Sequence, residues 1–339
     1  MIRKLMPSII LLLILAAAAG YAYSQNFFQK EDTPAADPRL LTMNVSEIDR
    51  IDIQTNSSGS AAAATNKAAS SVQPQTVQLD KQGETWSMTS PAAYPINPYT
   101  IQDWLTALQS ATIHGTVEEQ PSDTSKYGIH KNTPVFTVQS RNGSKLSLAI
   151  GDELPTKGYY YAQLKDGSII QLSQQTVTDL QADAFHFIDT TPIGWDDNQL
   201  TQLKWSSTQP QANWTLKHKP NIADPAQDTW TLDGKSIADD QGTSITDAVK
   251  NTPTDQLPVP AAQVNSYRNV LTLSVSLTVD GKGATEHYQG WQDPSDKQYV
   301  WITDPQNKWA YRISADQLST AAQSAEGSSQ NTDKSTTAP

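Results

Sequence analysis

The sequence of 339 residues contains no cysteine. It can therefore form no disulfide, no thiolate zinc site, no cysteine nucleophile and no lipid-modified N-terminal cysteine. Basic residues are also scarce, because 24 Lys and Arg stand against 35 Asp and Glu and leave a net charge of −11. Nucleic acids and anionic membrane surfaces bind clustered Lys and Arg, so the charge argues against both as partners.

Sequence patterns of catalytic and cofactor sites are missing as well. Neither G-x-G-x-x-G nor G-x4-G-K-[ST] occurs, which argues against a phosphate-binding loop, and no G-x-S-x-G marks a nucleophile turn. We predict no catalytic residue, no bound cofactor and no metal site, and interpret each histidine as an isolated core or surface residue. The histidines, which share no metal-ligand spacing, are His114, His130, His186, His218 and His287.

Pairs of adjacent carboxylates stand in polar stretches of the sequence. A calcium loop would place oxygen-bearing side chains at alternate positions and close with a glutamate, which these doublets do not do. An acid–base dyad is the other possibility, and we favour solvated surface charge. The doublets are Glu118-Glu119, Asp196-Asp197 and Asp239-Asp240.

The N-terminus carries a long hydrophobic run. Arg3 and Lys4 precede uncharged residues from Leu5 to Phe28, about enough to span a hydrocarbon layer of ~30 Å at 1.5 Å per residue. Basic residues before the run and acidic ones after it predict a cytoplasmic N-terminus and an exported bulk. We interpret residues 1–28 as a retained signal anchor of a single-pass cell-membrane protein. A cleaved signal peptide and a buried N-terminal helix are the alternatives.

Three further segments have the composition of linkers. We expect residues 29–44 to form a stalk after the anchor, residues 56–75 to form a flexible loop between two strands, and residues 321–339 to form a disordered tail. The rest of the chain is long enough for two modest domains.

The two halves of the chain resemble each other at offsets that stay constant within blocks. Because these offsets change only across loops, we predict an internal repeat, with residues 45–190 as its first copy and residues 198–320 as its second. Corresponding pairs are Trp86 with Trp230 and Ile101 with Ile245 at an offset of 144, and Phe136 with Leu277, Val138 with Val279, Tyr159 with Val300, Tyr161 with Ile302 and Leu172 with Ile313 at an offset of 141.

Each copy shows the same order of alternating strands and amphipathic helices. Asn142-Gly143, Asp166-Gly167 and Asp280-Gly281 stand between alternating segments and predict tight hairpins, whose strands must be antiparallel neighbours. Asn97 and Pro98 begin an apolar stripe with helical spacing. The predicted fold is therefore α+β: two tandem repeats, each a mainly antiparallel sheet with one or two packed helices, after an N-terminal transmembrane helix.

Aromatic residues are the only candidates for ligand contact. Four of the nine tryptophans, Trp86, Trp104, Trp205 and Trp230, occupy repeat-equivalent or helix-stripe positions, which indicates core packing. Tyr160, on the opposite strand face from Tyr159 and Tyr161, and Trp291 in the last hairpins are less constrained by the pattern. We therefore keep Tyr160 and Trp291 as possible contacts for a ligand or partner.

Several short motifs follow one another along the chain: VSEIDRIDI, ETWSM, Tyr127-Gly128-Ile129, LSLAIGD and GYYYAQLKDGSIIQLS. Their order, after a basic-led anchor, resembles that of a bacterial family catalogued as domain of unknown function 4340. The resemblance covers about Val45 to Ile188 well and the second half more loosely. It implies a membrane-anchored, outward-facing protein, often encoded beside ABC-type transporters of the gliding-motility kind, and it supplies no catalytic residues.

These inferences together predict a non-enzymatic, membrane-anchored extracytoplasmic protein that serves as an accessory or scaffold subunit of an ABC-type transport system. The alternative is a cell-envelope module that binds glycan or peptide through exposed aromatics. A hydrolase whose site is assembled in space is a third possibility.

Overall fold

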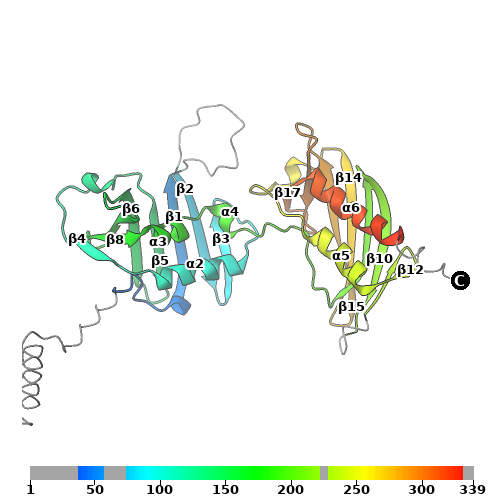
Figure 1. The fold of residues 1–339 in the computed structure, drawn as a ribbon, viewed down its shortest axis with the longest axis horizontal. Helices are drawn as coiled ribbons and strands as arrows, with labels where there is room; N and C mark the ends of the chain where they lie inside the picture. Colours follow the sequence, from blue (N-terminus) through cyan, green and yellow to red (C-terminus); the bar gives the residue numbers. More distant parts are fainter. Residues whose placement is uncertain (1–36, 57–73, 222–227, 331–339) are drawn as a thin grey trace, which may run out of the picture. The chain divides into compact units, whose positions relative to one another are not determined.

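The computed structural model describes residues 37–56, 74–221 and 228–330, which form two antiparallel sheets, each with helices packed on one face (Figure 1). The first sheet has eight strands, in the spatial order β3 (Thr85–Ser90), β2 (Pro74–Gln82), β1 (Ile48–Asn56), β5 (Val135–Ser140), β6 (Lys145–Glu153), β7 (Tyr159–Leu164), β8 (Ile169–Ser173) and β4 (Gly115–Glu118). Its helices are α2 (Pro98–Ser110), α3 (Gln174–Leu180) and α4 (Ala184–Phe187).

The second sheet has nine strands, in the order β12 (Lys235–Ile237), β11 (Thr229–Leu232), β10 (Gln211–Lys219), β9 (Leu200–Thr208), β14 (Asn269–Val279), β15 (Lys282–Gln292), β16 (Tyr299–Thr303), β17 (Trp309–Ser314) and β13 (Val259–Pro260). Its helices are α5 (Asp239–Lys250) and α6 (Ala315–Gln330).

The second sheet repeats the strand order of the first. When β12 is set aside, β11-β10-β9-β14-β15-β16-β17-β13 corresponds place by place to β3-β2-β1-β5-β6-β7-β8-β4. A helix follows β3 in the first half and β12 in the second, and another helix follows the last strand of the final hairpin in each half. The α+β class with mainly antiparallel sheets is confirmed, and the two sheets fit a tandem arrangement.

The strand registers correct four of the expected correspondences, two in each of two strands. Ile51 and Leu203 occupy equivalent places, because the pairing leads from them across the next strand to Met88 and Leu232, each two residues after the matching tryptophan. Ile51 pairs with Val138 while Leu203 pairs with Val275, so the equivalent of Val138 is Val275, at 275 − 138 = 137 rather than 141. By the same offset Phe136 corresponds to Leu273 and not to Leu277. An error of four residues keeps every side chain on the same face, so the apolar pattern alone does not expose it.

The other two corrections concern the tyrosine run. Tyr160 pairs with Leu172 and Val300 pairs with Ile313, so Val300 corresponds to Tyr160 and not to Tyr159. In the same register Tyr161 corresponds to Trp301 and not to Ile302. Three consecutive tyrosines show no alternation of polarity. The sequence therefore does not indicate which of them lie on the core face of this strand.

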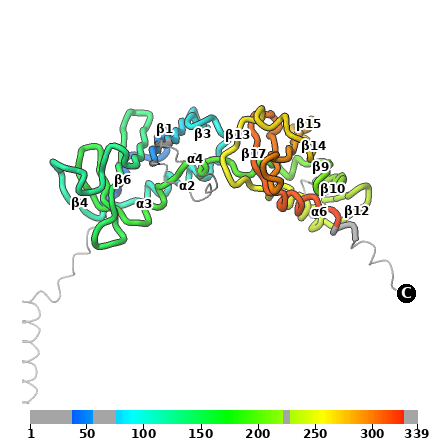
Figure 2. Tube along the Cα trace, turned by 90° about the horizontal axis from the view of Figure 1, so that it is seen from above, coloured from blue at the N-terminus to red at the C-terminus, as the bar shows by residue number. Residues whose placement is uncertain are grey.

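One face of each sheet carries the main hydrophobic core. In the first half, Ile101, Leu105 and Leu108 of α2 are buried against the sheet, and the Trp104 indole donates a hydrogen bond to the Leu180 carbonyl of α3 at 3.1 Å. Figure 2 shows α2 and α3 on one side of their strands, and α6 on one side of the strands of the second sheet.

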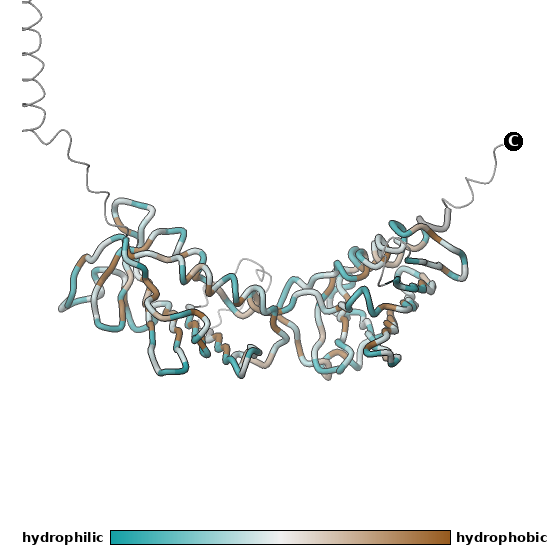
Figure 3. Tube along the Cα trace, turned by 90° about the horizontal axis from the view of Figure 1, so that it is seen from below, coloured by the Kyte–Doolittle hydropathy of each residue, from teal (hydrophilic) through white to brown (hydrophobic). Residues whose placement is uncertain are grey.

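The second core contains larger aromatics. Trp205 of β9 stacks on Trp214 of β10 with ring centroids 5.7 Å apart, and the Trp214 indole donates to the Ala322 carbonyl of α6 at 3.0 Å. Strand β10 alternates between exposed and buried positions as a half-buried strand should. Figure 3 shows the same interleaving of hydrophobic and hydrophilic residues along the chain in both halves.

The structure corrects the expected extents of the stalk and the tail. Leu40 and Leu41 are buried in the first core, and the Leu40 amide donates to the Ala111 carbonyl, so the stalk does not extend to residue 44. Helix α6 continues to Gln330 because Ala321, Ala322 and Ala325 are buried, whereas a polar tail was expected from residue 321.

The expected signal anchor (residues 1–28) lies outside the described residues, as does the expected flexible loop apart from its ends. Among the residues that are described, no helix has both the length and the apolar character needed to cross a membrane.

Gly242 in α5 tests the packing of the second core. A Cβ atom at this position would lie 2.2 Å from the Trp230 ring, so Gly242→Ala should destabilise the protein by about 1–3 kcal/mol despite the higher helix propensity of alanine. Urea denaturation measures the effect, with Gly283→Ala as the control, because nothing lies within 4 Å of its added Cβ atom. A more stable Gly242→Ala variant would contradict the packing described here.

Candidate functional site

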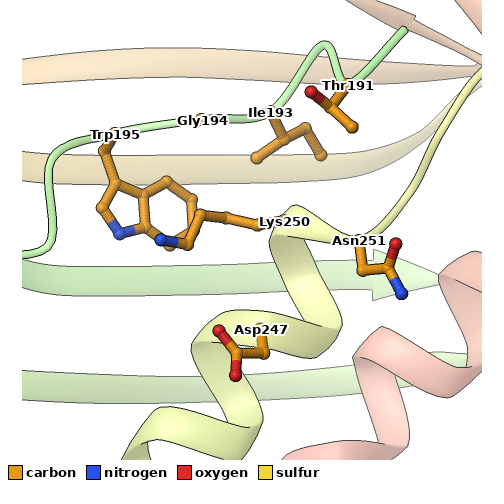
Figure 4. A pocket seen from close by; sticks show the side chains of 7 residues that line it. All are labelled: Thr191, Ile193, Gly194, Trp195, Asp247, Lys250 and Asn251. Carbon is orange, nitrogen blue, oxygen red and sulfur yellow. The ribbon is translucent and has the colours of Figure 1, made fainter. Parts of the chain in front are cut away.

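A surface pocket lies between the end of α5 and the segment that follows the first repeat (Figure 4). Its volume is about 450 Å³. The pocket combines an aromatic ring, a cation, a carboxylate and an amide. Its lining residues are Thr191, Ile193, Gly194, Trp195, Asp247, Lys250 and Asn251.

The segment on one side of the pocket is fixed by its own hydrogen bonds and by burial. The Asp189 carboxylate accepts hydrogen bonds from the amide and the hydroxyl of Thr191, and Ile193 is buried in the second core. The Tyr288 hydroxyl donates to the Gly194 carbonyl at 3.3 Å, and burial, followed by the nearby Glu286, raises the pKa of Tyr288 well above its usual value. This segment is thus held against the second core.

Helix α5 supplies the other side of the pocket. The helix ends at Lys250, and Pro253 follows shortly after, where a helix cannot easily continue. Lys250 stands in the last turn, where a positive charge is favoured by the helix dipole. Asp247, one turn earlier, lines the same pocket as Asn251.

The charge of Lys250 is neutralised inside this arrangement. Its Nζ donates to both carboxylate oxygens of Asp197, each at 2.6 Å, and lies 5.2 Å from the centroid of the Trp195 ring. Figure 4 shows the lysine side chain directed toward the indole. The Trp195 Nε1 is buried and has no hydrogen-bond acceptor within the described part of the chain. Asp247 and Asn251 add a carboxylate and an amide to the lining, which suit hydroxyl and amide groups of a neutral ligand.

The two aromatic candidates from the sequence do not meet in one patch. Tyr160 is half-buried and packs against the first core, whereas Trp291 is half-buried beside Val264 and Trp301 on the other face of the second sheet. The Trp291 indole nitrogen is buried and lacks an acceptor among the described residues.

A smaller pocket of about 250 Å³ is lined in part by the residues that directly follow Trp291 in the sequence. Arg268, Gln292, Asp293 and Lys297 are among its lining residues. Burial alone would raise the pKa of Asp293, but hydrogen bonds from Ser295 and the Trp301 indole outweigh it and hold the pKa below its usual value. Asp293 therefore stabilises its own loop, and Arg268 and Lys297 add two cationic side chains to the pocket lining.

The carboxylate doublets prove to be partly structural. Asp197 holds Lys250, Asp239 accepts a hydrogen bond from the Trp230 indole at 2.8 Å, and Glu118 accepts from the side chains of Lys126 and Tyr127. The expectation of purely solvated charge is therefore too simple for these three residues. Within residues 37–56, 74–221 and 228–330, no three histidine or acidic side chains are grouped so that they can hold a metal ion.

His218 is the one buried histidine among the five and belongs to a polar cluster in the second core. Its Nε2 lies 2.9 Å from the Asp228 carboxylate and its Nδ1 lies 3.1 Å from the Leu200 carbonyl. The ring stacks on Trp230 at 3.8 Å between centroids. Asp228 also accepts the Asn221 amide, so this cluster ties β10 to the start of β11.

Sequence reasoning missed the pocket beside Trp195. Trp195 stands in the connecting segment, outside any alternating or helical pattern, and Lys250 appears in the sequence only as the end of a weak helix. The sequence signal that could have indicated this pocket is a tryptophan directly before the Asp196-Asp197 doublet. Its partner in the pocket, Lys250, lies 55 residues further along the chain.

Comparisons with known proteins give one match. A family model described as "Domain of unknown function (DUF4340)" matches residues 86–288, from β3 of the first sheet to β15 of the second. The matched region thus starts later and extends further than the resemblance drawn from the motifs. No curated protein and no solved structure matches the chain significantly.

Asp228→Asn should lower the free energy of unfolding near neutral pH and change how that free energy depends on pH. Burial alone would raise the pKa of Asp228, but hydrogen bonds from the Asn221 amide and from His218 lower it, so the ionised carboxylate stabilises the fold. We expect a loss of about 1–3 kcal/mol at pH 7. This difference should persist above the unfolded-state pKa of about 4 and shrink as the pH falls through the lower folded-state value.

Urea denaturation of both proteins between about pH 3 and pH 7 measures this difference. Asp103→Asn on the exposed side of α2 is the matched control and should leave the profile unchanged. A pH-independent difference for Asp228→Asn would contradict the role of the carboxylate.

Proposed function

The chain belongs to the family described as domain of unknown function (DUF4340), and from that premise we propose that it is a non-enzymatic, membrane-anchored extracytoplasmic accessory or scaffold subunit of an ABC-type transport system. Its partners would be transporter subunits in the same membrane. The N-terminal hydrophobic run from Leu5 to Phe28 would hold it there, with the N-terminus in the cytoplasm and the bulk outside.

The observation that supports this proposal is that one sheet-and-helix arrangement occurs twice, and that several of its carboxylates bind other side chains of the same chain. Asp197 binds Lys250, Asp228 binds His218, and Asp293 accepts a hydrogen bond from the Trp301 indole. A chain built in this way offers extended surfaces and sheet edges to a partner. That favours a role in assembly over a role in chemistry.

Co-purification tests the proposal directly. The full chain is co-expressed with the ABC-type permease encoded nearest to it, and the membrane fraction is solubilised in mild detergent. We expect the permease to elute with the tagged chain in near-stoichiometric amounts, because both would belong to one complex. Replacement of residues 1–28 by a cleavable signal should reduce the yield, since the anchor concentrates the chain beside its partner.

An unrelated single-pass protein with the same tag is the control. A permease yield no higher than with that control would contradict the proposal.

A second candidate function is the binding of a neutral glycan or peptide in the pocket beside Trp195. The specific observation is that an indole ring, the Asp247 carboxylate and the Asn251 amide line one pocket of about 450 Å³. Aromatic rings that bury an apolar ligand face, together with a few hydrogen-bonding groups, are typical of such sites.

Tryptophan fluorescence tests this second candidate. Titration with soluble cell-wall fragments should change the emission of the natural protein, and Trp195→Phe should remove most of that change because the ring nearest the ligand is lost. Trp291→Phe is the matched control and should retain it. Loss of the signal in Trp291→Phe alone would move the ligand to the last hairpins and contradict the assignment to this pocket.

A further inference from the structure

We propose that the outer edge of β3 in the first sheet is a docking site for an extended segment of a partner protein, which adds to the sheet as an antiparallel strand. This inference deepens the accessory role and rests on it, since it names how the partner is held. Strand addition of this kind draws its affinity from main-chain hydrogen bonds and its specificity from side chains on alternate positions.

The second repeat contains the occupant that the first repeat lacks. Strand β12 covers the edge of β11, with Trp230 opposite Ile237 and Leu232 opposite Lys235. In the first sheet, β3 takes the place of β11 and is the outermost strand of the part that the structure describes. Trp86 and Met88 of β3 correspond to Trp230 and Leu232 at the same offset of 144.

The hairpin geometry directs the free backbone groups of β3 outward. Gln82 and Thr85 flank a two-residue turn at Gly83 and pair with each other, which makes them a hydrogen-bonded pair. Because hydrogen-bonded and non-bonded pairs alternate in an antiparallel ladder, the N–H and C=O groups of Trp86 and Met88 point away from β2. The equivalent groups of Trp230 and Leu232 are the ones that face β12.

The four sheet edges differ in how they are protected against an added strand. Strand β4 has four residues, ends at Glu118 and contains a register shift; β12 has three residues and carries Lys235; β13 has two residues, one of them Pro260. Short strands, charges, irregularities and prolines are the usual protections of an edge. Strand β3 has six residues and contains no charge and no proline. Its one register shift lies at its end, between Met88 and Ser90, and leaves the stretch from Thr85 to Met88 regular.

The side chains along β3 indicate the chemistry of the occupant. Trp86 is half-buried at the margin of the first core, whereas its equivalent Trp230 is only 6% exposed. Ile237, opposite Trp230, packs against the second core. The segment that docks on β3 therefore carries an aliphatic residue opposite Trp86, with a small polar residue before it opposite the exposed Ser87.

The size of the edge favours a linear segment over a second copy of the chain. Six residues of strand span about 20 Å, and at a sheet thickness of about 10 Å the paired edges would bury on the order of 400 Å² in all. Stable protein dimers bury roughly 1,200–2,000 Å². A segment anchored to the same membrane as the chain gains from a high effective concentration and needs no such area.

Disulfide trapping tests the proposal, because the chain has no cysteine of its own. The probe is a peptide with the sequence of residues 233–239 and the change Ser236→Cys, since Ser236 stands opposite Thr231, the equivalent of Ser87. The full chain with Ser87→Cys should form the mixed disulfide about tenfold faster than the full chain with Thr278→Cys. Thr278 is equally exposed but lies on β14, an inner strand with neighbours on both sides.

A peptide that also carries Ile237→Pro is the control for strand pairing, because proline removes the N–H that would face Trp86; it should abolish the difference. Equal rates for Ser87→Cys and Thr278→Cys would overturn the docking site, and so would a preferred disulfide between two copies of the Ser87→Cys chain. Neither result bears on permease co-purification, so failure of this inference is distinguishable from failure of the accessory role.

Discussion

Burial of one face of each sheet beneath its helices is the constraint on which the rest of the structure depends. In the first half, Ile53 and Val77 are paired across the two strands, and the seven-residue α3 lies in the same core. In the second half, the corresponding pair is Trp205 and Trp214, and the sixteen-residue α6 is needed to cover it. The larger aromatic pair and the longer helix are thus two consequences of one packing requirement.

The parts of the fold that the sequence predicts well are those with a strong period. The apolar stripe from Ile101 to Leu108 begins after Asn97, whose side chain accepts the Tyr99 amide as a helix cap should. Hairpin turns at Asn142-Gly143 and Asp166-Gly167 lie where they were expected. Alternation, caps and tight turns are local, so a single sequence carries them completely.

The parts that escaped prediction have no local signal. The edge strands β4, β12 and β13 have two to four residues, too few to show a period. The end of α6 is rich in Ala, Ser and Gln and resembles a linker, yet it is ordered by burial of small residues under Trp214. The pocket at Trp195 depends on a contact with Lys250, which only the tertiary fold creates.

The two repeats differ at one sheet edge, which is formed by β3 in the first repeat and lies beside β11 in the second. One copy supplies its own additional strand, and the other ends on a neutral strand of six residues. Because a duplicated unit buries its core in the same way twice, a difference in one edge leaves the core unchanged. Such an edge is free to acquire a role in recognition, which is the role that we propose for β3.

Amide hydrogen exchange of the isolated full chain, resolved to single residues, tests this difference between the repeats most directly. The account predicts strong protection for the amides of Trp230 and Leu232, which face β12, and exchange at least about a hundredfold faster for those of Trp86 and Met88. Equal protection of the two pairs would show that the edge of β3 is already covered, and would contradict the account.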